Sequence, residues 1–254
     1  ASDVYKRQGM KRAPKDPRDI FDEFIADCRR AFGEELKAIC LYGSGARGEY
    51  VPGRSDVNFL LLLSERGIRE LDRAFGLVAK WRKRNVAVPL FLTEEYVKGS
   101  LDSFPLEFLD MELHHLLLYG KDPFEDLHIR GEDLRLQCER EVKGKLLILR
   151  EAYVSSGGRP RDLSTVLARS IVAFSIVFEG LLYLKGLEIP PNRSGVIRAL
   201  CEAAGLREEV FQAALSIKEG RVKPTREELL RLMTDYMEEV RRLAFWIDEM
   251  EEGR

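Results

Sequence analysis

The sequence predicts a small α+β domain followed by an all-helical bundle, and three observations lead to this fold class. Three short apolar runs alternate with helical patterns in the first half of the chain. Beyond residue 131, apolar residues recur almost only at helical spacing. Between these halves, residues 120–131 combine glycine, proline and charge, which is typical of a linker. We therefore expect a domain with a small mixed sheet and flanking helices over residues 10–125, and a helical domain over residues 126–254.

The first domain is expected to open with a helix over residues 16–32, where apolar residues follow an Asp-Pro start at helical spacing. Strands are expected over 36–42, 56–63 and 86–92, because these apolar runs are too continuous for a solvated edge. Amphipathic helices are expected over 68–82 and 105–115, with another starting near Thr93. Residues 116–120 resemble a short strand or a connector. This order predicts a sheet with helices packed on it.

The second domain is expected to contain five helices, over residues 134–154, 163–184, 194–204, 207–217 and 226 to about 251. Glycine and proline separate them at 155–160 and 190–191. The apolar stretch from Val172 to Phe178 lies between Arg169 and Glu179, much shorter than the roughly 20 residues that a membrane-spanning helix needs. We therefore expect the central helix of a bundle and no membrane segment.

Composition narrows the class of protein. Lys and Arg (41) and Asp and Glu (43) nearly balance, giving a net charge of −2, whereas general nucleic-acid binders usually carry a basic excess. The four cysteines (Cys28, Cys40, Cys138, Cys201) show no paired spacing, which disfavours a zinc site or a disulfide framework and fits a cytoplasmic protein.

Residues 1–9 are expected to be an artefact. The run Asp3-Val4-Tyr5-Lys6-Arg7-Gln8 resembles a translated sequencing-library adapter, which would place the native start near Met10. Such an adapter implies a metagenomic, prokaryotic source.

The run that carries chemistry is Leu41-Tyr42-Gly43-Ser44-Gly45-Ala46-Arg47-Gly48, followed by Ser55-Asp56-Val57-Asn58. A strand enters a Gly-Ser turn, where glycine allows close approach of the backbone to a phosphate and free amides favour an anion. The planar fork of Arg47 can pair with phosphate oxygens. Asp56 and Asn58 are two apart at the start of a strand and so share one face. Paired acids at such positions hold Mg²⁺ through hard oxygen ligands.

These residues resemble the signature of the polymerase-beta-like nucleotidyltransferase superfamily, in its small prokaryotic branch with kanamycin-type and minimal nucleotidyltransferases. The resemblance is close over residues 39–63 and extends weakly over 16–120. It implies that Gly43, Ser44 and Arg47 bind the phosphates of a nucleoside triphosphate. It also implies that Asp56, with position 58, serves catalysis and binds Mg²⁺.

The chain departs from this signature at two acidic positions. Asn58 stands where the family has a second aspartate, and Pro89 stands at the expected place of the third acid, in Val88-Pro89-Leu90. Proline supplies neither a base nor a metal ligand. The fixed charge thus falls from about −3 to about −1, too little for two clamped magnesium ions. Either Glu94 or Glu95 replaces the missing acid through a different strand register, or both form the acidic first turn of a helix, which we favour.

Two other groups of residues have simpler interpretations. His114 and His115 lack a zinc-binding frame, so we expect one packed and one exposed histidine. Five arginines are candidates to line a ligand cleft but are more simply interpreted as surface residues: Arg159, Arg161, Arg169, Arg193 and Arg198.

Three hypotheses on function follow. The favoured one is a nucleotide-binding protein with weak or lost catalysis, in a regulatory or antitoxin-like role. The second is an active, Mg²⁺-dependent nucleotidyltransferase that moves a nucleoside monophosphate to a hydroxyl acceptor. The third is an interaction scaffold without a ligand. The expected partners are a nucleotide and an unidentified acceptor or protein, and a homodimer is left open.

Overall fold

The computed structural model describes residues 13–250, so the expectation for residues 1–9 lies outside the described residues. The chain divides into two compact units. The first contains the described residues up to 101 together with 107–128, and the second contains 102–106 and the described residues from 129 onward. The predicted boundary after residue 125 lies close to residue 128, where the first unit ends.

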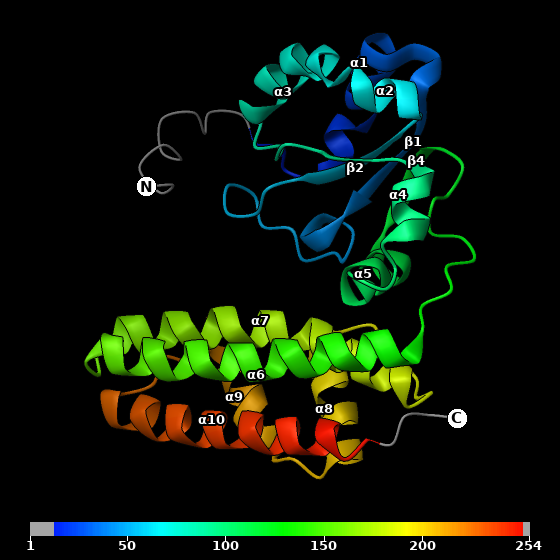
Figure 1. Ribbon diagram of the computed structural model, residues 1–254. Coiled ribbons are helices and arrows are strands. Elements are labelled where there is room, and N and C mark those ends of the chain that lie inside the picture. The colour runs from blue at the N-terminus through cyan, green and yellow to red at the C-terminus, as the bar shows by residue number, and fades with distance from the viewer. Residues whose placement is uncertain (1–12, 251–254) are drawn as a thin grey trace. The chain divides into compact units, whose positions relative to one another are not determined.

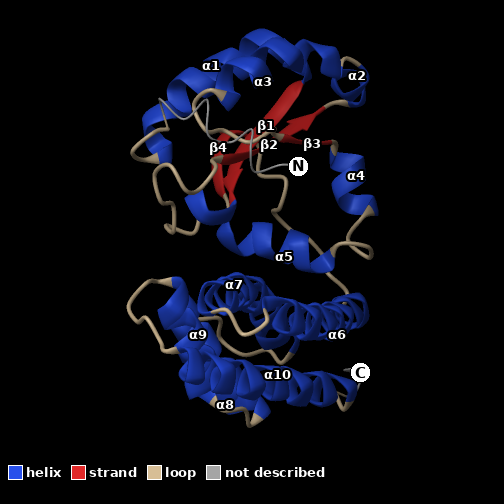
Figure 2. Cartoon of the chain, turned by 90° about the vertical axis from the view of Figure 1, so that its left-hand side faces the viewer, coloured by secondary structure: helices blue, strands red, loops and turns tan. Residues whose placement is uncertain are grey.

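A four-stranded mixed sheet forms the first unit, in the order β3-β2-β1-β4 (Figures 1 and 2). Its strands are β1 (Leu36–Tyr42), β2 (Asn58–Leu63), β3 (Leu90–Leu92) and β4 (Leu116–Gly120). Strand β1 pairs antiparallel with β2 and β4, whereas β2 and β3 run parallel. The flanking helices are α1 (Phe21–Phe32), α2 (Glu65–Arg69), α3 (Ala74–Arg82), α4 (Glu94–Gly99) and α5 (Pro105–His114). This arrangement is consistent with the α+β nucleotidyltransferase-like fold expected above.

Helices α1 and α3 cover one face of the sheet, as Figure 2 shows, while α4 and α5 lie on its other side. The core beneath α1 and α3 is strongly aromatic: the Phe24 ring stacks on Phe59 at 4.0 Å and meets Trp81 edge-on at 5.2 Å. Alternate residues of β2 contribute to this core: Phe59, Leu61 and Leu63 are buried there, as is Val57 just before the strand. Because side chains alternate along a strand, Asn58 belongs to the opposite face.

The helix expected over 68–82 is interrupted. Chain geometry leaves the helical region at Glu70 (φ −113°, ψ 36°), so α2 and α3 are separate helices. Gly67 explains the position of α2: a Cβ there would lie 3.1 Å from side-chain atoms of both Glu35 and Leu63, so α2 packs close to the strand ends. Ser64 caps α2 by accepting a hydrogen bond from the Gly67 amide at 3.1 Å.

The second unit is helical, as expected: α6 (Gly131–Ser156), α7 (Pro160–Leu184), α8 (Arg193–Ala204), α9 (Glu208–Lys218) and α10 (Arg226–Asp248). Helix α10 ends at Asp248, before the expected end at 251, which lies outside the described residues. An edge-on aromatic cluster joins α7, α9 and α10, with 5.3 Å between the ring centroids of Phe178 and Phe211 and of Phe211 and Tyr236. The buried Tyr236 hydroxyl meets the Ser170 hydroxyl at 3.1 Å.

Helix α7 is long and apolar enough to cross a membrane, judged by length and composition. In this fold it packs against α6, α8, α9 and α10, and 56% of its most apolar 18-residue stretch is buried. Its polar Ser175 is also fully buried, with its hydroxyl donating to the Ile171 carbonyl at 2.7 Å. These features are those of a helix at the centre of a bundle.

Candidate functional site

The Gly-Ser turn directly follows β1. Gly43 to Gly45 form a short 3-10 turn, and the amides of Ala46 and Arg47 both donate to the Gly43 carbonyl, at 3.1 and 3.0 Å. Between residues 13 and 250, the amides of Ser44 and Gly45 find no hydrogen-bond acceptor. The turn therefore presents two free amide hydrogens, as the sequence interpretation requires.

Gly43 must be glycine for two reasons. Its φ is +68°, a left-handed conformation that residues with a Cβ rarely adopt. A Cβ would also lie 3.2 Å from the side-chain nitrogen of Asn58, which is the partner of Tyr42 across the β1–β2 ladder. The turn and the start of β2 are thus in direct contact, so the two halves of the motif come together.

The backbone on either side of Asp56 is anchored by Asn85. The Asn85 side-chain amide donates to the Ser55 carbonyl at 2.7 Å, and the Val57 amide donates to the Asn85 carbonyl at 3.0 Å. Asn85 itself adopts a left-handed conformation (φ 62°), which asparagine tolerates. Asp56 therefore has a defined position at the entrance to β2.

The Asp56 carboxylate is half-buried, and within residues 13–250 it forms no ion pair and accepts no hydrogen bond. Tyr50 lies close enough to sense its charge. Burial is the main cause that raises the pKa of Tyr50, and the negative charges of Asp56, Asp16 and Asp19 add to it. The Tyr50 hydroxyl donates to the Pro14 carbonyl at 3.0 Å. An unpaired carboxylate in a partly shielded place is available to a cation.

Asn58 offers one neutral oxygen beside Asp56. Its side-chain nitrogen donates weakly to the main-chain oxygen of Asp56, at 3.4 Å, and among the residues that the structure describes its amide oxygen has no donor. One carboxylate and one amide oxygen fit a single Mg²⁺ that keeps most of its water ligands. They do not fit a pair of magnesium ions, which needs several bridging carboxylates.

The chain segment beside β2, which would carry the third acidic residue, offers no carboxylate in any pairing with β2. Val57 pairs with Val86, and Leu60 pairs with Leu90, so the chain beside β2 holds one extra residue in this interval. The intervening residues are Ala87, the 56% exposed Val88 and the buried Pro89. Whichever of them lies level with Asn58, this strand supplies no carboxylate. The absence of a carboxylate, inferred from the sequence at Pro89, therefore holds for Ala87 and Val88 as well.

Glu94 and Glu95 do not replace the missing acid. They begin α4 after the end of β3, whose last residue, Leu92, pairs with Leu62. Leu62 is four residues along β2 from Asn58, or roughly 13 Å. Glu94 instead pairs with Lys98 at 2.6 Å, and Thr93 caps the helix. The interpretation as an acidic first turn agrees with this geometry.

Arg47 has a carboxylate partner that the sequence analysis missed. Its guanidinium pairs with Asp110 on α5, and the two side chains are only 8% and 17% exposed. Separating a buried pair of this kind costs about 3–5 kcal/mol. One hydrogen bond to a charged group returns only about 1.5–3 kcal/mol. A phosphate would therefore compete poorly for Arg47, whose predicted phosphate contact remains a prediction.

The two histidines are both half-buried, so the expectation that one would be exposed is wrong. His115 has a structural explanation: Nδ1 meets the Met111 carbonyl at 2.7 Å and Nε2 meets the Asp122 carboxylate at 2.9 Å. Its ring also packs edge-on against Phe124 at 4.9 Å. Both ring nitrogens are thus engaged within the fold.

Several of the arginines considered as cleft residues also have partners. Arg193 is only 9% exposed and donates to the Val172 carbonyl at 3.2 Å. Arg159 pairs with Asp162, and Arg198 with Glu208 at 3.4 Å. These contacts stabilise helix ends and helix packing.

Comparison with known proteins supports the superfamily in part. The chain is 42% identical over 55 residues to a Methanocaldococcus jannaschii protein named "Putative protein adenylyltransferase". The match covers 22% of this chain and 37% of that protein, so the chain spans well under half of the relative's length. No family model matches the chain. An adenylyltransferase is a nucleotidyltransferase, so the match and the α+β fold agree with the resemblance found in the sequence.

Proposed function

We propose that this protein binds a nucleoside triphosphate at the turn of residues 43–47, with weak or lost catalysis. The observation that carries the proposal is the Asp56 carboxylate, which is unpaired within the described residues and lies two residues before Asn58, the residue that contacts the turn with two free amides. The amides of Ser44 and Gly45 would receive phosphate oxygens. Asp56 and the Asn58 oxygen would share one Mg²⁺ that arrives with the nucleotide.

Weak catalysis follows from the count of acids. Two-metal transfer uses several carboxylates to stabilise both the attacking and the leaving oxygen. Asp56 is the one carboxylate that the motif retains, and no residue from Ala87 to Pro89 can act as a base. A protein that binds a nucleotide without turning it over suits a regulatory or antitoxin-like role, in the cytoplasm.

Active transfer is the second candidate, and the name of the matched relative favours it. In that case an NMP group would pass from the triphosphate to a hydroxyl oxygen, with release of pyrophosphate. Because the relative is named for protein adenylylation, a protein hydroxyl is the first acceptor to test. A ligand-free scaffold would need neither activity.

One experiment separates these functions. Thermal unfolding is measured with ATP, GTP, CTP and UTP, each with and without Mg²⁺, for the wild type, Asp56→Ala and the control Asp72→Ala. We expect stabilisation by at least one Mg·NTP, reduced in Asp56→Ala and retained in the exposed control. No shift with any nucleotide would refute binding.

Transfer is tested by incubating the protein with α-labelled NTP, alone and with cell extract. Label that enters protein in the wild type and disappears in Asp56→Ala would favour the active enzyme over the proposal. Binding without label incorporation supports the proposal.

A further inference from the structure

Arg47 forms contacts at both ends: its backbone amide bonds within the turn, and its guanidinium bonds to helix α5. Its amide donates to the Gly43 carbonyl at 3.0 Å, and its guanidinium pairs with Asp110, which lies 63 residues later on α5. Both side chains are largely buried, at 8% and 17% exposure. The end of the turn is therefore attached to a helix that covers the sheet.

The turn needs such an attachment because its own sequence is permissive. Residues 43–48 include three glycines, and two of them, Gly43 and Gly48, have positive φ angles of 68° and 72°. Glycine samples many backbone conformations when nothing restrains it. The local restraints are three backbone hydrogen bonds, two to the Gly43 carbonyl and one from Glu49 to the Ser44 carbonyl at 2.9 Å.

The guanidinium can have one of two roles. As a phosphate ligand that gives up Asp110 when it binds, it would be released by removal of the Asp110 charge, and nucleotide binding would tighten. As an anchor, it stays on Asp110, and removal of that charge would loosen the turn and weaken binding. The two roles therefore predict opposite signs for the same substitution.

We propose that Asp110 is a positioning residue for the nucleotide site, which holds Arg47 and thereby preorganises the amides of Ser44 and Gly45. The inference rests on the proposed function for its ligand, and it deepens that function by assigning phosphate recognition to the backbone. Preorganised donors bind an anion better because they lose less freedom on binding.

The test uses Asp110→Asn, which keeps the shape of the side chain and removes its charge. Glu107→Gln is the matched control, because it makes the same chemical change at an exposed position of α5. The affinity for the NTP that stabilises the wild type is measured by calorimetry. Amide hydrogen exchange of the segment 43–49 is measured without nucleotide, with the bundle as internal reference.

We expect Asp110→Asn to weaken NTP binding by about tenfold and to speed exchange in 43–49 by a similar factor, while the bundle exchanges as before. A general loss of stability would instead change exchange throughout the first unit. Glu107→Gln should stay within about twofold of wild type in both measurements. Tighter or unchanged binding in Asp110→Asn would overturn the inference.

The charge-swapped variant Arg47→Asp/Asp110→Arg gives a second test. An anchor recovers part of the affinity lost in the single variants, because the ion pair can form in reverse. A phosphate ligand cannot recover, because a carboxylate would then face the phosphate.

The hydrogen-exchange measurement also separates this inference from the proposed function. Faster exchange in 43–49 with no nucleotide binding by the wild type would refute the proposed function and retain the anchor. Unchanged exchange in Asp110→Asn would refute the anchor, whether or not the protein binds a nucleotide.

Discussion

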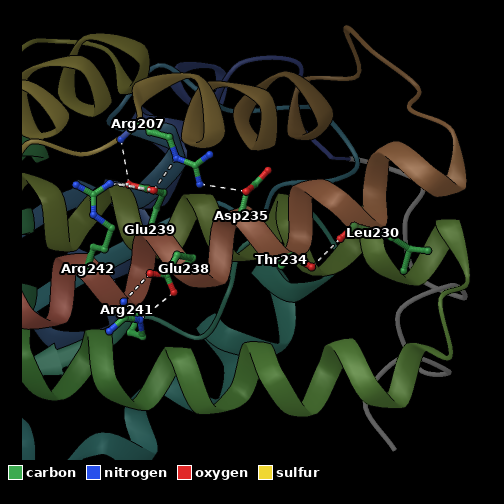
Figure 3. Close-up of polar contacts among 8 residues, drawn as sticks. All are labelled: Arg207, Leu230, Thr234, Asp235, Glu238, Glu239, Arg241 and Arg242. Atoms are coloured by element: carbon green, nitrogen blue, oxygen red, sulfur yellow. Dashed lines mark hydrogen bonds and ion pairs between the residues drawn. The ribbon is translucent and has the colours of Figure 1, made fainter.

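Glu239 stabilises the helical unit through a buried carboxylate that binds two arginines (Figure 3). It is 1% exposed and accepts from the Arg207 amide at 3.0 Å and from the Arg207 Nε at 2.7 Å. Arg242 donates to both of its oxygens, at 3.1 and 3.0 Å, and also to the Gly205 carbonyl at 2.7 Å. One carboxylate therefore ties the loop between α8 and α9 to α10.

The neighbouring Glu238 provides a matched control on the same helix. It pairs with Arg241, at 2.6 Å from Nη2 to Oε1, but both side chains are nearly half exposed, at 46% and 44%. Substitution of either glutamate by alanine changes helix propensity equally, so the difference between the variants isolates the buried contacts. Exposed pairs of this type contribute little because water and salt screen them.

Loss of one partner in a buried charge network costs about 3–5 kcal/mol. Arg207 and Arg242 are 42% and 43% exposed, so water replaces part of what they lose. For Glu239→Ala we therefore expect a loss of about 2–3 kcal/mol, below the range for fully buried networks. At about 4 °C per kcal/mol for a unit of this size, Tm falls by about 8–12 °C.

The assay is thermal and urea unfolding of the wild type, Glu239→Ala and Glu238→Ala, followed by far-UV circular dichroism. We expect a large fall in Tm for Glu239→Ala and a Tm within error of wild type for Glu238→Ala. Equal effects of the two substitutions would refute the reasoning, because burial would then make no difference to the pair.

Three further outcomes are expected. Burial alone raises the pKa of Glu239, but the Arg207 amide and the two guanidinium groups outweigh it and lower the pKa from its ordinary value. This stabilisation is present above the ordinary glutamate pKa and is lost as pH falls through the lowered pKa. A pH series of unfolding should therefore lose part of its acid slope in Glu239→Gln. Gly48→Ala should cost about 1–2 kcal/mol from its positive φ. Gly43→Ala should cost more in the same denaturant titration, because its Cβ would also meet Asn58 at 3.2 Å, and equal costs would contradict this contact. Asn58→Asp should tighten Mg²⁺ binding about tenfold in a metal titration by thermal shift, because a second carboxylate joins Asp56. The control Asn192→Asp makes an equal charge change at the cap of α8 and should leave Mg²⁺ binding unchanged. A similar gain in the control would indicate a nonspecific charge effect.

The elements that the sequence predicts well are those with local causes. Strand β1 was expected over its observed residues because a continuous apolar run ends at a glycine turn. The helices of the second unit follow from apolar spacing with clear stops, such as the left-handed Gly157 after α6 and Gly205 after α8. In these segments, propensity and pattern agree with the packing that the fold requires.

The elements predicted less well depend on contacts between distant residues. The break between α2 and α3 falls at Glu70, where the backbone leaves the helical region, and no apolar period reveals it. Only Leu90–Leu92 of the expected strand 86–92 forms a regular ladder, because the chain accommodates an extra residue beside β2. Such irregularities leave the alternation of apolar residues almost unchanged, and therefore escape a reading of the sequence.

The same division applies within the candidate site. Gly43, Ser44, Asp56 and Asn58 are close in sequence, and their approach follows from one hairpin of adjacent strands. Asp110 is 63 residues from Arg47 and lies in an unremarked stretch of α5, so no spacing rule selects it. Its role depends on where α5 packs, and that information resides in the tertiary structure.

The residues of the motif differ in how strongly they support a bound ligand, because the fold alone explains some of them. The fold by itself accounts for Gly43, whose positive φ and close contact with Asn58 require glycine whether or not a phosphate binds. It accounts equally for Arg47, which pairs with Asp110. Asp56 differs, because within residues 13–250 its carboxylate has no ion-pair or hydrogen-bond partner to stabilise. An unpaired carboxylate is the group of this motif that a bound cation would pair with. The case for a nucleotide therefore depends on Asp56 more than on the glycine turn, and Asp56→Ala is its most direct test.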